Sequence, residues 1–353
     1  MRREHGTGHI TRNANMNSLL SLPQPVLVTG GAGFIGMHLV ARLLADGNQV
    51  VVFDVPGAQI PNTWRERVRV ICGDIAHRGD VDAAMQGIGT VFHAAAIVSD
   101  WAPRKAYERV TLQGSRYLFE AAVHNRTRVL LLSSGSVYGD KIGRGVLRED
   151  EPLERPLGIY GEFKQRQESL GWKFQRERGM QLTVVRPFKV FGPGSKPWVH
   201  EVAGNLLKGN PTLINGGNYN PGLVYVENLV DILVRAASLP YAQGRVYNGY
   251  DGTIATLRRY FTDLARIIGA PPPKVMPGWF ARMLAAVVEP TWRIMRKKSR
   301  PLLTNDSLRM ISSDYQISTA RVRDELGFTP RVSYEEGMRR VEAYWRGRTA
   351  SGI

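Results

Sequence analysis

The sequence predicts an α/β fold in which a doubly wound parallel sheet carries a smaller, mainly helical C-terminal lobe. Short β-branched runs alternate with longer helical stretches, the runs are apolar throughout, and this rhythm ends after Pro187. Strands that are separated by helices form parallel βαβ units with right-handed crossovers. Strands that are apolar at every position are covered on both faces of the sheet. We therefore expect helices on both faces.

The elements follow one another along the chain in a regular order. The predicted strands are residues 26–29, 50–54, 68–71, 90–93, 129–133 and 182–186. The predicted helices between them are residues 35–46, 81–85, 106–123 and 160–178. Gly, Pro and Asn clusters then precede helical stretches at residues 227–238, 256–268 and 277–298. This change of rhythm indicates a separate C-terminal lobe.

The composition is that of a globular protein with a strong excess of basic residues. The 353 residues include 47 Lys and Arg against 31 Asp and Glu, a formal net charge of +16, and 43% are hydrophobic. These values exclude a disordered, collagen-like or multi-span membrane chain. The single Cys72 excludes a disulfide framework and a cysteine-based zinc site, and it is typical of a reducing compartment. We expect a cytoplasmic protein without a metal site.

The N-terminal residues 1–24 are polar and lack the continuous apolar core of a signal peptide, so we expect a disordered tail there. The predicted domains are then a cofactor domain over residues 25–186 and a substrate lobe over residues 187–345, interleaved with late sheet elements. Residues 346–353 are expected to form a second tail.

The segment VLVTGGAGFIG joins the first predicted strand to the first helix. Glycines at Gly30, Gly33 and Gly36 permit a tight turn and let the backbone approach a pyrophosphate at the helix N-terminus. Asp54 ends the next strand, where its carboxylate can accept hydrogen bonds from an adenosine ribose. No basic residue follows Asp54 directly, and a carboxylate repels a 2′-phosphate. The pattern predicts a Rossmann-type domain that binds NAD, with NADP disfavoured.

Tyr160 and Lys164 are four residues apart at the start of a predicted helix, so they share one face. A free Tyr hydroxyl titrates at about 10, too high for acid–base chemistry at neutral pH. A neighbouring ammonium stabilises the phenolate and lowers that pKa. Ser134, in LLSSGSVYG, lies at the carboxyl end of a predicted strand, where ligands of α/β proteins bind. These side chains are candidates for proton transfer and for binding a substrate oxygen.

The motifs TGGAGFIG, Asp54, GDI, FHAAA, SSGSVYG, YGEFK and RPFKVFGPG occur in this order, and together they resemble the extended short-chain dehydrogenase/reductase superfamily over about residues 25–345. The resemblance implies that Tyr160 is the acid/base, that Lys164 also holds the nicotinamide ribose, and that Ser134 polarises the reacting oxygen. It also implies that Asp74 binds the adenine of the cofactor. The implied cofactor site consists of Gly30, Gly33, Phe34, Ile35, Gly36, Asp54, Asp74, Ile75, Ala94, Ala95, Tyr160, Lys164 and Pro187.

Within this superfamily, the segment VYVENLVD looks like that of the 3β-hydroxysteroid dehydrogenase-like group. Sugar-nucleotide members usually have Asn where this chain has Lys189, and an Arg in the stretch that here spans residues 219–228 without one. Thr111 stands where the family usually has Asn. We predict an NAD-dependent oxidoreductase acting on a steroid-like or long-chain β-keto substrate. An NDP-sugar epimerase or dehydratase with tightly bound NAD stays open, and a non-catalytic NAD sensor is a third reading.

Trp101, Ser136 and Lys189 are the candidates for the hydrophobic substrate pocket. Residues 277–300 combine large apolar residues with a basic run, which favours either peripheral contact with an anionic membrane surface or a helix pair over the pocket. A homodimer is also consistent with the family resemblance. No basic–aromatic motif accompanies the net charge, so we expect no nucleic-acid partner.

Overall fold

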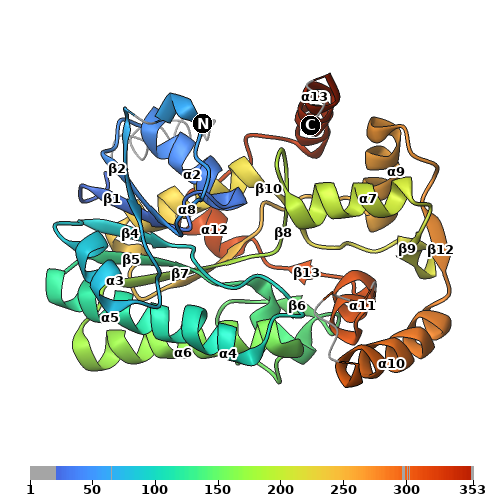
Figure 1. Ribbon diagram of the computed structural model, residues 1–353, viewed down its shortest axis with the longest axis horizontal. Helices are drawn as coiled ribbons and strands as arrows, with labels where there is room; N and C mark the ends of the chain where they lie inside the picture. The colour runs from blue at the N-terminus through green and yellow to red at the C-terminus, as the bar shows by residue number, and fades with distance from the viewer. Residues whose placement is uncertain (1–20, 65, 296–298, 300, 302, 351–353) are drawn as a thin grey trace, which may run out of the picture.

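The computed structural model describes residues 21–350 apart from 65, 296–298, 300 and 302. Its centre is a seven-stranded sheet in the order β11-β7-β5-β4-β1-β2-β3, and each neighbouring pair is parallel (Figure 1). The strands are β1 Val26–Thr29, β2 Val50–Asp54, β3 Val68–Cys72, β4 Thr90–His93, β5 Arg128–Leu132, β7 Leu182–Pro187 and β11 Val246–Gly249. The predicted doubly wound sheet is therefore confirmed.

Six of these strands coincide with the predicted ones to within one residue, whereas β11 was not predicted. Its sequence, VYNG, has only two apolar residues before Asn and Gly, too short a run to indicate a strand. β11 pairs with β7, so the chain returns to the sheet from the C-terminal lobe.

The strand order reverses between β1 and β4, which lie side by side although two strands separate them in sequence. In open α/β sheets, ligands bind outside the carboxyl ends of the strands at such a switch point. The glycine-rich turn after β1 and the segment that begins at Ala94 after β4 both lie at this edge.

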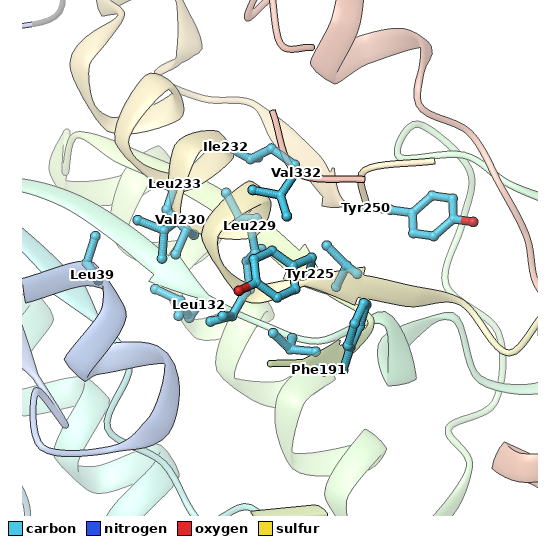
Figure 2. Packing of buried hydrophobic residues seen from close by; sticks show 14 of the residues in the cluster. Leu39, Leu132, Phe191, Tyr225, Leu229, Val230, Ile232, Leu233, Tyr250 and Val332 are labelled. Carbon is cyan, nitrogen blue, oxygen red and sulfur yellow. The ribbon is translucent and has the colours of Figure 1, made fainter. Parts of the chain in front are cut away.

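Both faces of the sheet are covered by helices. Within β1, Val26 and Val28 pack into one hydrophobic cluster and Leu27 into another, as the alternation of side chains along a strand requires. Helices α2 Phe34–Ala45 and α8 Val226–Ser238 contribute to the first cluster, in which Figure 2 shows Leu39 of α2 with Leu132 and residues of α8. The second cluster contains residues of α3 Arg78–Met85, α5 Gly114–Asn125 and α6 Gly158–Arg178.

The helix predicted over residues 106–123 differs from the observed segment. It begins as α4 Arg104–Ala106, continues as the π-helical η2 Tyr107–Gln113, and ends as α5. Thr111 lies within the π-helical part and is buried there. Helices α3 and α6 also begin before their predicted starts, because a propensity pattern rarely locates the first turn.

The C-terminal lobe is mainly helical, as predicted. It contains η4 Lys196–His200, α7 Glu201–Leu207, α9 Leu257–Ile268, α10 Gly278–Ile294 and α11 Asn305–Ser312. Short parallel pairs join β6 Val146–Leu147 to β13 Gln316–Ile317, β8 Lys189–Phe191 to β10 Leu223–Tyr225, and β9 Pro211–Ile214 to β12 Lys274–Met276. The last helices are α12 Ala320–Asp324 and α13 Tyr334–Ala350.

Three sequence boundaries fall differently in the structure. The expected change of domain after residue 186 lies inside β7, and the expected tail from residue 346 lies partly inside α13. The segment predicted as a helix to residue 298 ends at Ile294, and residues 296–298 lie outside the described part of the chain. Within the described residues, no helix is both long and apolar enough to cross a bilayer.

A buried ion pair connects helix α6 to strand β7 of the central sheet. Arg186 of β7 donates from Nε to Glu168 Oε1 at 3.0 Å and from Nη2 to Oε2 at 2.8 Å, and both side chains are at most 4% exposed. The Ser133 hydroxyl donates to the same carboxylate. This bidentate geometry is the kind that offsets the cost of removing two charges from water.

We predict that Glu168→Gln lowers the free energy of unfolding by about 3 to 5 kcal/mol, because it leaves the buried Arg186 guanidinium without its counter-charge. Urea unfolding followed by circular dichroism measures this. The matched control is Asp324→Asn, which removes an exposed carboxylate that also pairs with an arginine, Arg323. We expect no measurable change for that control. Equal unfolding curves for the wild type and Glu168→Gln would contradict the role of the pair.

Candidate active site

The glycine-rich turn has the geometry of an anion cradle. Gly30 has φ of +69°, and a Cβ at Gly36 would lie 2.2 Å from the Gly30 carbonyl oxygen, so neither position accepts a side chain without a backbone shift. Gly33 is the N-cap of α2, whose first turn has no side-chain cap and no acidic residue. The first backbone N–H groups of α2, at Phe34, Ile35 and Gly36, are therefore left for an anion such as a pyrophosphate.

Asp54 closes the turn from the neighbouring strand. Its Oδ2 accepts from Ala32 N at 2.9 Å and its Oδ1 from Val55 N at 2.8 Å. The side chain remains partly exposed at the carboxyl edge of β2, so each oxygen retains a lone pair for a ribose hydroxyl. Asp54 thus supports the glycine turn and fits an unphosphorylated adenosine ribose.

The remaining predicted cofactor residues surround the same edge. Asp74 pairs with Arg109 through Oδ2, and its Oδ1 accepts from Ala76 N at 2.9 Å. Ile75 is buried, and Ala94 and Ala95 lie so close to Gly30 that a Cβ there would be 3.1 Å from Ala95 N. Sequence reasoning missed Arg109, whose partner is distant in the chain. Pro187 ends β7 beside Gly249 of β11.

Ser134 and Tyr160 meet at the carboxyl end of β5. Ser134 Oγ accepts from Ser136 N at 3.2 Å and from Ser136 Oγ at 3.0 Å, which leaves its own proton for the Tyr160 oxygen. Burial raises the pKa of Tyr160, and the hydrogen bond with Ser134 opposes that rise. Two predicted catalytic residues are therefore in contact, and Ser136 orients one of them.

Lys164 points into the protein beneath this pair. It is 3% exposed, and its Nζ donates to the Leu132 carbonyl oxygen and to Gln167 Oε1, each at 2.9 Å. An ammonium has three donors, so one remains for a ribose hydroxyl or for Tyr160. Burial lowers the pKa of Lys164 to about 8, with the Glu168 carboxylate opposing.

A buried polar chain continues from Lys164 to β1. Gln167 Nε2 donates to Ser115 Oγ at 2.7 Å, and the Ser115 hydroxyl donates to the Thr111 carbonyl oxygen. His93 lies 2.9 Å from Ser115 through Nε2 and 2.9 Å from Thr29 Oγ1 through Nδ1. Because the Ser115 proton is committed to Thr111, His93 must donate from Nε2 and accept at Nδ1.

These hydrogen bonds give His93 a structural place. Sequence reasoning missed Ser115 and Gln167. Their signal in the sequence is weak: Gln167 stands three residues after Lys164 on one helix face, and Ser115 four residues after Thr111. Burial lowers the pKa of His93 to about 3, with the Lys164 charge as a further cause, so the imidazole stays neutral.

A cluster of aromatic rings lies next to Gly135, the residue after Ser134. The Phe188 ring lies against Gly135, where a Cβ would be 2.5 Å from it. Around Phe188 are the rings of Tyr138, Tyr250 and Tyr315, with centroids 6.0 to 6.2 Å away. This is an apolar wall beside the candidate catalytic pair.

The other two candidates for the substrate pocket, Trp101 and Lys189, are buried to different extents. Trp101 is partly buried in the segment after β4, where its backbone N donates to Ser99 Oγ at 3.0 Å. Lys189 is 3% exposed, donates from Nζ to the Pro221 carbonyl oxygen at 2.6 Å, and lies 3.4 Å from the centroid of the Tyr315 ring. Burial lowers the pKa of Lys189.

Three of the six basic residues between positions 104 and 128 contact groups of the protein itself. Arg104 pairs with Glu162, and Arg109 pairs with Asp74. Arg128 donates to the carbonyl oxygens at the end of α8, including that of Ala237 at 2.9 Å. These contacts reduce the charge that this segment offers to an external anion.

Known proteins with this architecture match most of the chain. A model of the NAD dependent epimerase/dehydratase family matches residues 26–248. A 2-alkyl-3-oxoalkanoate reductase of Stenotrophomonas maltophilia (strain K279a) is 28% identical and covers 90% of this chain and 98% of its own. A 3-beta-hydroxysteroid dehydrogenase of Mycolicibacterium neoaurum is 27% identical, with 91% of each covered. The structure of MoeE5 in complex with UDP-glucose and NAD has a TM-score of 0.72 at 28% identity, covering 93% of this chain and 100% of that one.

We predict that His93 makes the protein sensitive to acid. Its folded-state pKa lies below the ordinary 6.5, so only the unfolded chain takes up a proton as the pH falls toward 3, and stability is lost over that window. The loss attributable to His93 is about 1.4 kcal/mol per pH unit. Urea unfolding at pH 6, 5 and 4 should show a shallower pH dependence for His93→Gln. The exposed His124→Gln is the control and should retain the wild-type slope.

Proposed function

Because the chain belongs to the NAD dependent epimerase/dehydratase family, we propose that it is an oxidoreductase that uses NAD to interconvert a secondary alcohol and a ketone on a hydrophobic substrate. Steroid-like and long-chain β-keto compounds are the substrate classes that fit. The observation that carries the proposal is the contact between Ser134 and Tyr160 beside an apolar wall of aromatic rings.

Each side chain has a role that follows from its contacts. In the direction of oxidation, the Tyr160 oxygen accepts the proton of the substrate hydroxyl, and in reduction it returns that proton to the carbonyl oxygen. With substrate bound, the single Ser134 proton turns from Tyr160 to the same substrate oxygen, and Ser136 holds Ser134 in place. The remaining Lys164 proton stabilises the phenolate. NAD supplies the hydride acceptor, and its reduced form the donor.

The residues of the chain fit NAD at the edge next to this pair. The uncapped start of α2 and the missing side chains at Gly30 and Gly36 suit the pyrophosphate, and Asp54 suits the adenosine ribose. A 2′-phosphate at Asp54 would meet a carboxylate, which supports NAD over NADP.

Three observations support the proposal of a hydrophobic substrate. Phe188 is partly exposed beside Gly135, and buried tyrosine rings pack around it. Its ring gains free energy by contacting an apolar group and offers no hydrogen-bond donor to a sugar. The relatives named 2-alkyl-3-oxoalkanoate reductase and 3-beta-hydroxysteroid dehydrogenase act, by those names, on substrates of these classes. The stretch 219–228 also lacks the Arg that would hold a diphosphate bidentately.

We predict that Tyr160→Phe lowers turnover of the best substrate by at least about 100-fold, because the proton of the reacting oxygen loses its acceptor. Turnover is measured from nicotinamide absorbance across a panel of sterols, long-chain β-hydroxy and β-keto acids, and UDP- and dTDP-sugars, with NAD and NADP. NAD binding, measured by thermal shift, should persist in the variant.

The matched control for that variant is Tyr241→Phe, which removes an exposed hydroxyl that donates to the Glu325 carbonyl oxygen at 2.9 Å. It should turn over like the wild type. Full turnover by Tyr160→Phe would refute the acid–base role. Turnover confined to nucleotide sugars would refute the hydrophobic substrate while leaving the role of Tyr160 in place.

One observation favours a second candidate, an enzyme that acts on an NDP-sugar. Lys189 is buried and makes no ion pair with any residue that the structure describes. Burial of an uncompensated ammonium is costly, and a diphosphate would supply the missing counter-charge. MoeE5, which is similar over the whole chain, was solved with UDP-glucose. NAD would then be reduced and reoxidised on one bound sugar.

The two candidates predict opposite behaviour of Lys189→Met. If a diphosphate binds there, the KM for the nucleotide sugar rises by at least about tenfold with a smaller change in kcat, because one charge-assisted contact is lost. If the substrate is an apolar ketone, its KM stays within about threefold of the wild type, since no anion pairs with the lysine. Steady-state kinetics on both substrate classes separates the outcomes.

A further inference from the structure

Helix α10 of the C-terminal lobe exposes a stripe of large apolar side chains. Trp279, Met283, Val287 and Ile294 are 64%, 51%, 63% and 82% exposed. Their spacings of four and seven residues place them along one face of the helix. The neighbouring Phe280 ring packs edge-on against Trp279 with centroids 5.7 Å apart.

The opposite side of α10 already has its packing partners. Ala281 and Ala285 are fully buried in a cluster with Ile214, Leu303 and Leu308. The exposed stripe is therefore additional apolar surface that the fold does not use. Figure 1 shows α10 at the end of the molecule away from the central sheet, beside α11. Contiguous exposed apolar surface of this kind marks an interaction site.

The charge around the stripe is positive. Arg282 is exposed on α10 and borders the stripe next to Met283. From Leu264 to Ile294, Glu289 is the sole acidic residue in the sequence. Its carboxylate is turned toward α11, where Oε2 accepts from Asn305 N and Nδ2, each at 2.9 Å.

We propose that the exposed stripe of α10 docks onto an anionic lipid surface. The Trp279, Met283, Val287 and Ile294 side chains would enter the boundary between headgroups and acyl chains, and Arg282 would lie among the lipid phosphates. An amphipathic helix with an aromatic apolar face and cationic flanks binds membranes in this way.

The charges favour a lipid surface over a second copy of the chain. Because Arg282 borders the stripe, a symmetric dimer through this face would bring the Arg282 side chains of both copies to the edge of one apolar contact. Like charges at an apolar contact oppose association, whereas an anionic surface attracts them. The net charge of +16 adds to that attraction.

The stripe is connected to the candidate active site through α11. Thr304, the N-cap of α11, donates to Asp100 Oδ2 at 2.8 Å in the segment that carries Trp101. Asp306 lies so close to Gly158, at the start of α6, that a Cβ there would be 1.9 Å from its Oδ2. One helix therefore separates the lipid-facing surface from the helix that bears Tyr160.

Vesicle flotation tests the surface contact without reference to the reaction. The full chain should float with vesicles of phosphatidylcholine and phosphatidylglycerol, and it should be released by high salt. The triple variant Trp279→Ser, Met283→Ser, Val287→Ser should bind these vesicles at least about tenfold more weakly, because it removes most of the inserted apolar area. All three side chains are exposed, so the fold should be retained, which circular dichroism checks.

The matched control is Ile254→Ser, which removes an 88% exposed apolar side chain outside α10 and should float like the wild type. Equal flotation of the triple variant and the wild type, or salt-independent binding to phosphatidylcholine alone, would overturn the proposal. A lipid-free dimer in light scattering that the triple variant abolishes would assign the stripe to a second copy and would also overturn it. None of these outcomes depends on the substrate that the site turns over.

Discussion

The buried ion pair between Glu168 and Arg186 is the constraint on which the candidate active site depends. Glu168 lies on α6, the helix that carries Tyr160 and Lys164, and Arg186 immediately precedes Pro187 on β7. The same carboxylate accepts from Ser133, the residue before Ser134. One bidentate contact therefore fixes the relative positions of all three predicted catalytic side chains. Buried charges tolerate little displacement, because any lengthening leaves each of them uncompensated.

Around this pair the interior is polar where an ordinary core would be apolar. Lys164, Gln167, Ser115 and His93 form a continuous chain of hydrogen bonds, and one Lys164 proton is left for a ribose hydroxyl or for Tyr160. A chain of this kind rigidifies its members only if every group is satisfied. Here the neutral His93 closes it against Thr29 of β1, so the catalytic lysine is held from the strand that also leads into the glycine-rich turn. The glycine-rich turn and the proton-transfer residues are therefore both connected to strand β1.

The basic residues that produce the net charge of +16 fall into two groups in the structure, those that pair within the chain and those that are exposed. Some arginines bind groups of the same chain. Arg104 pairs with the Glu162 carboxylate, and Arg128 donates to the Ala237 carbonyl oxygen at the end of α8. In the stretch from Leu264 to Ile294, Glu289 is the sole acidic residue of the sequence, and the exposed Arg282 borders apolar side chains of α10 there. Local pairing, rather than total charge, therefore decides which basic surface is available to an external anion.

The sequence by itself determined the parallel sheet, the cofactor turn and the face shared by Tyr160 and Lys164, because these follow from local periodicity and from glycine. It could not determine the chain through His93, Ser115 and Gln167 or the partners of Glu168 and Asp74, since these groups come from elements far apart in the sequence. It also could not decide which side of α10 is buried, because both sides are apolar. Only tertiary packing, which covers Ala281 and leaves Trp279 exposed, makes that choice.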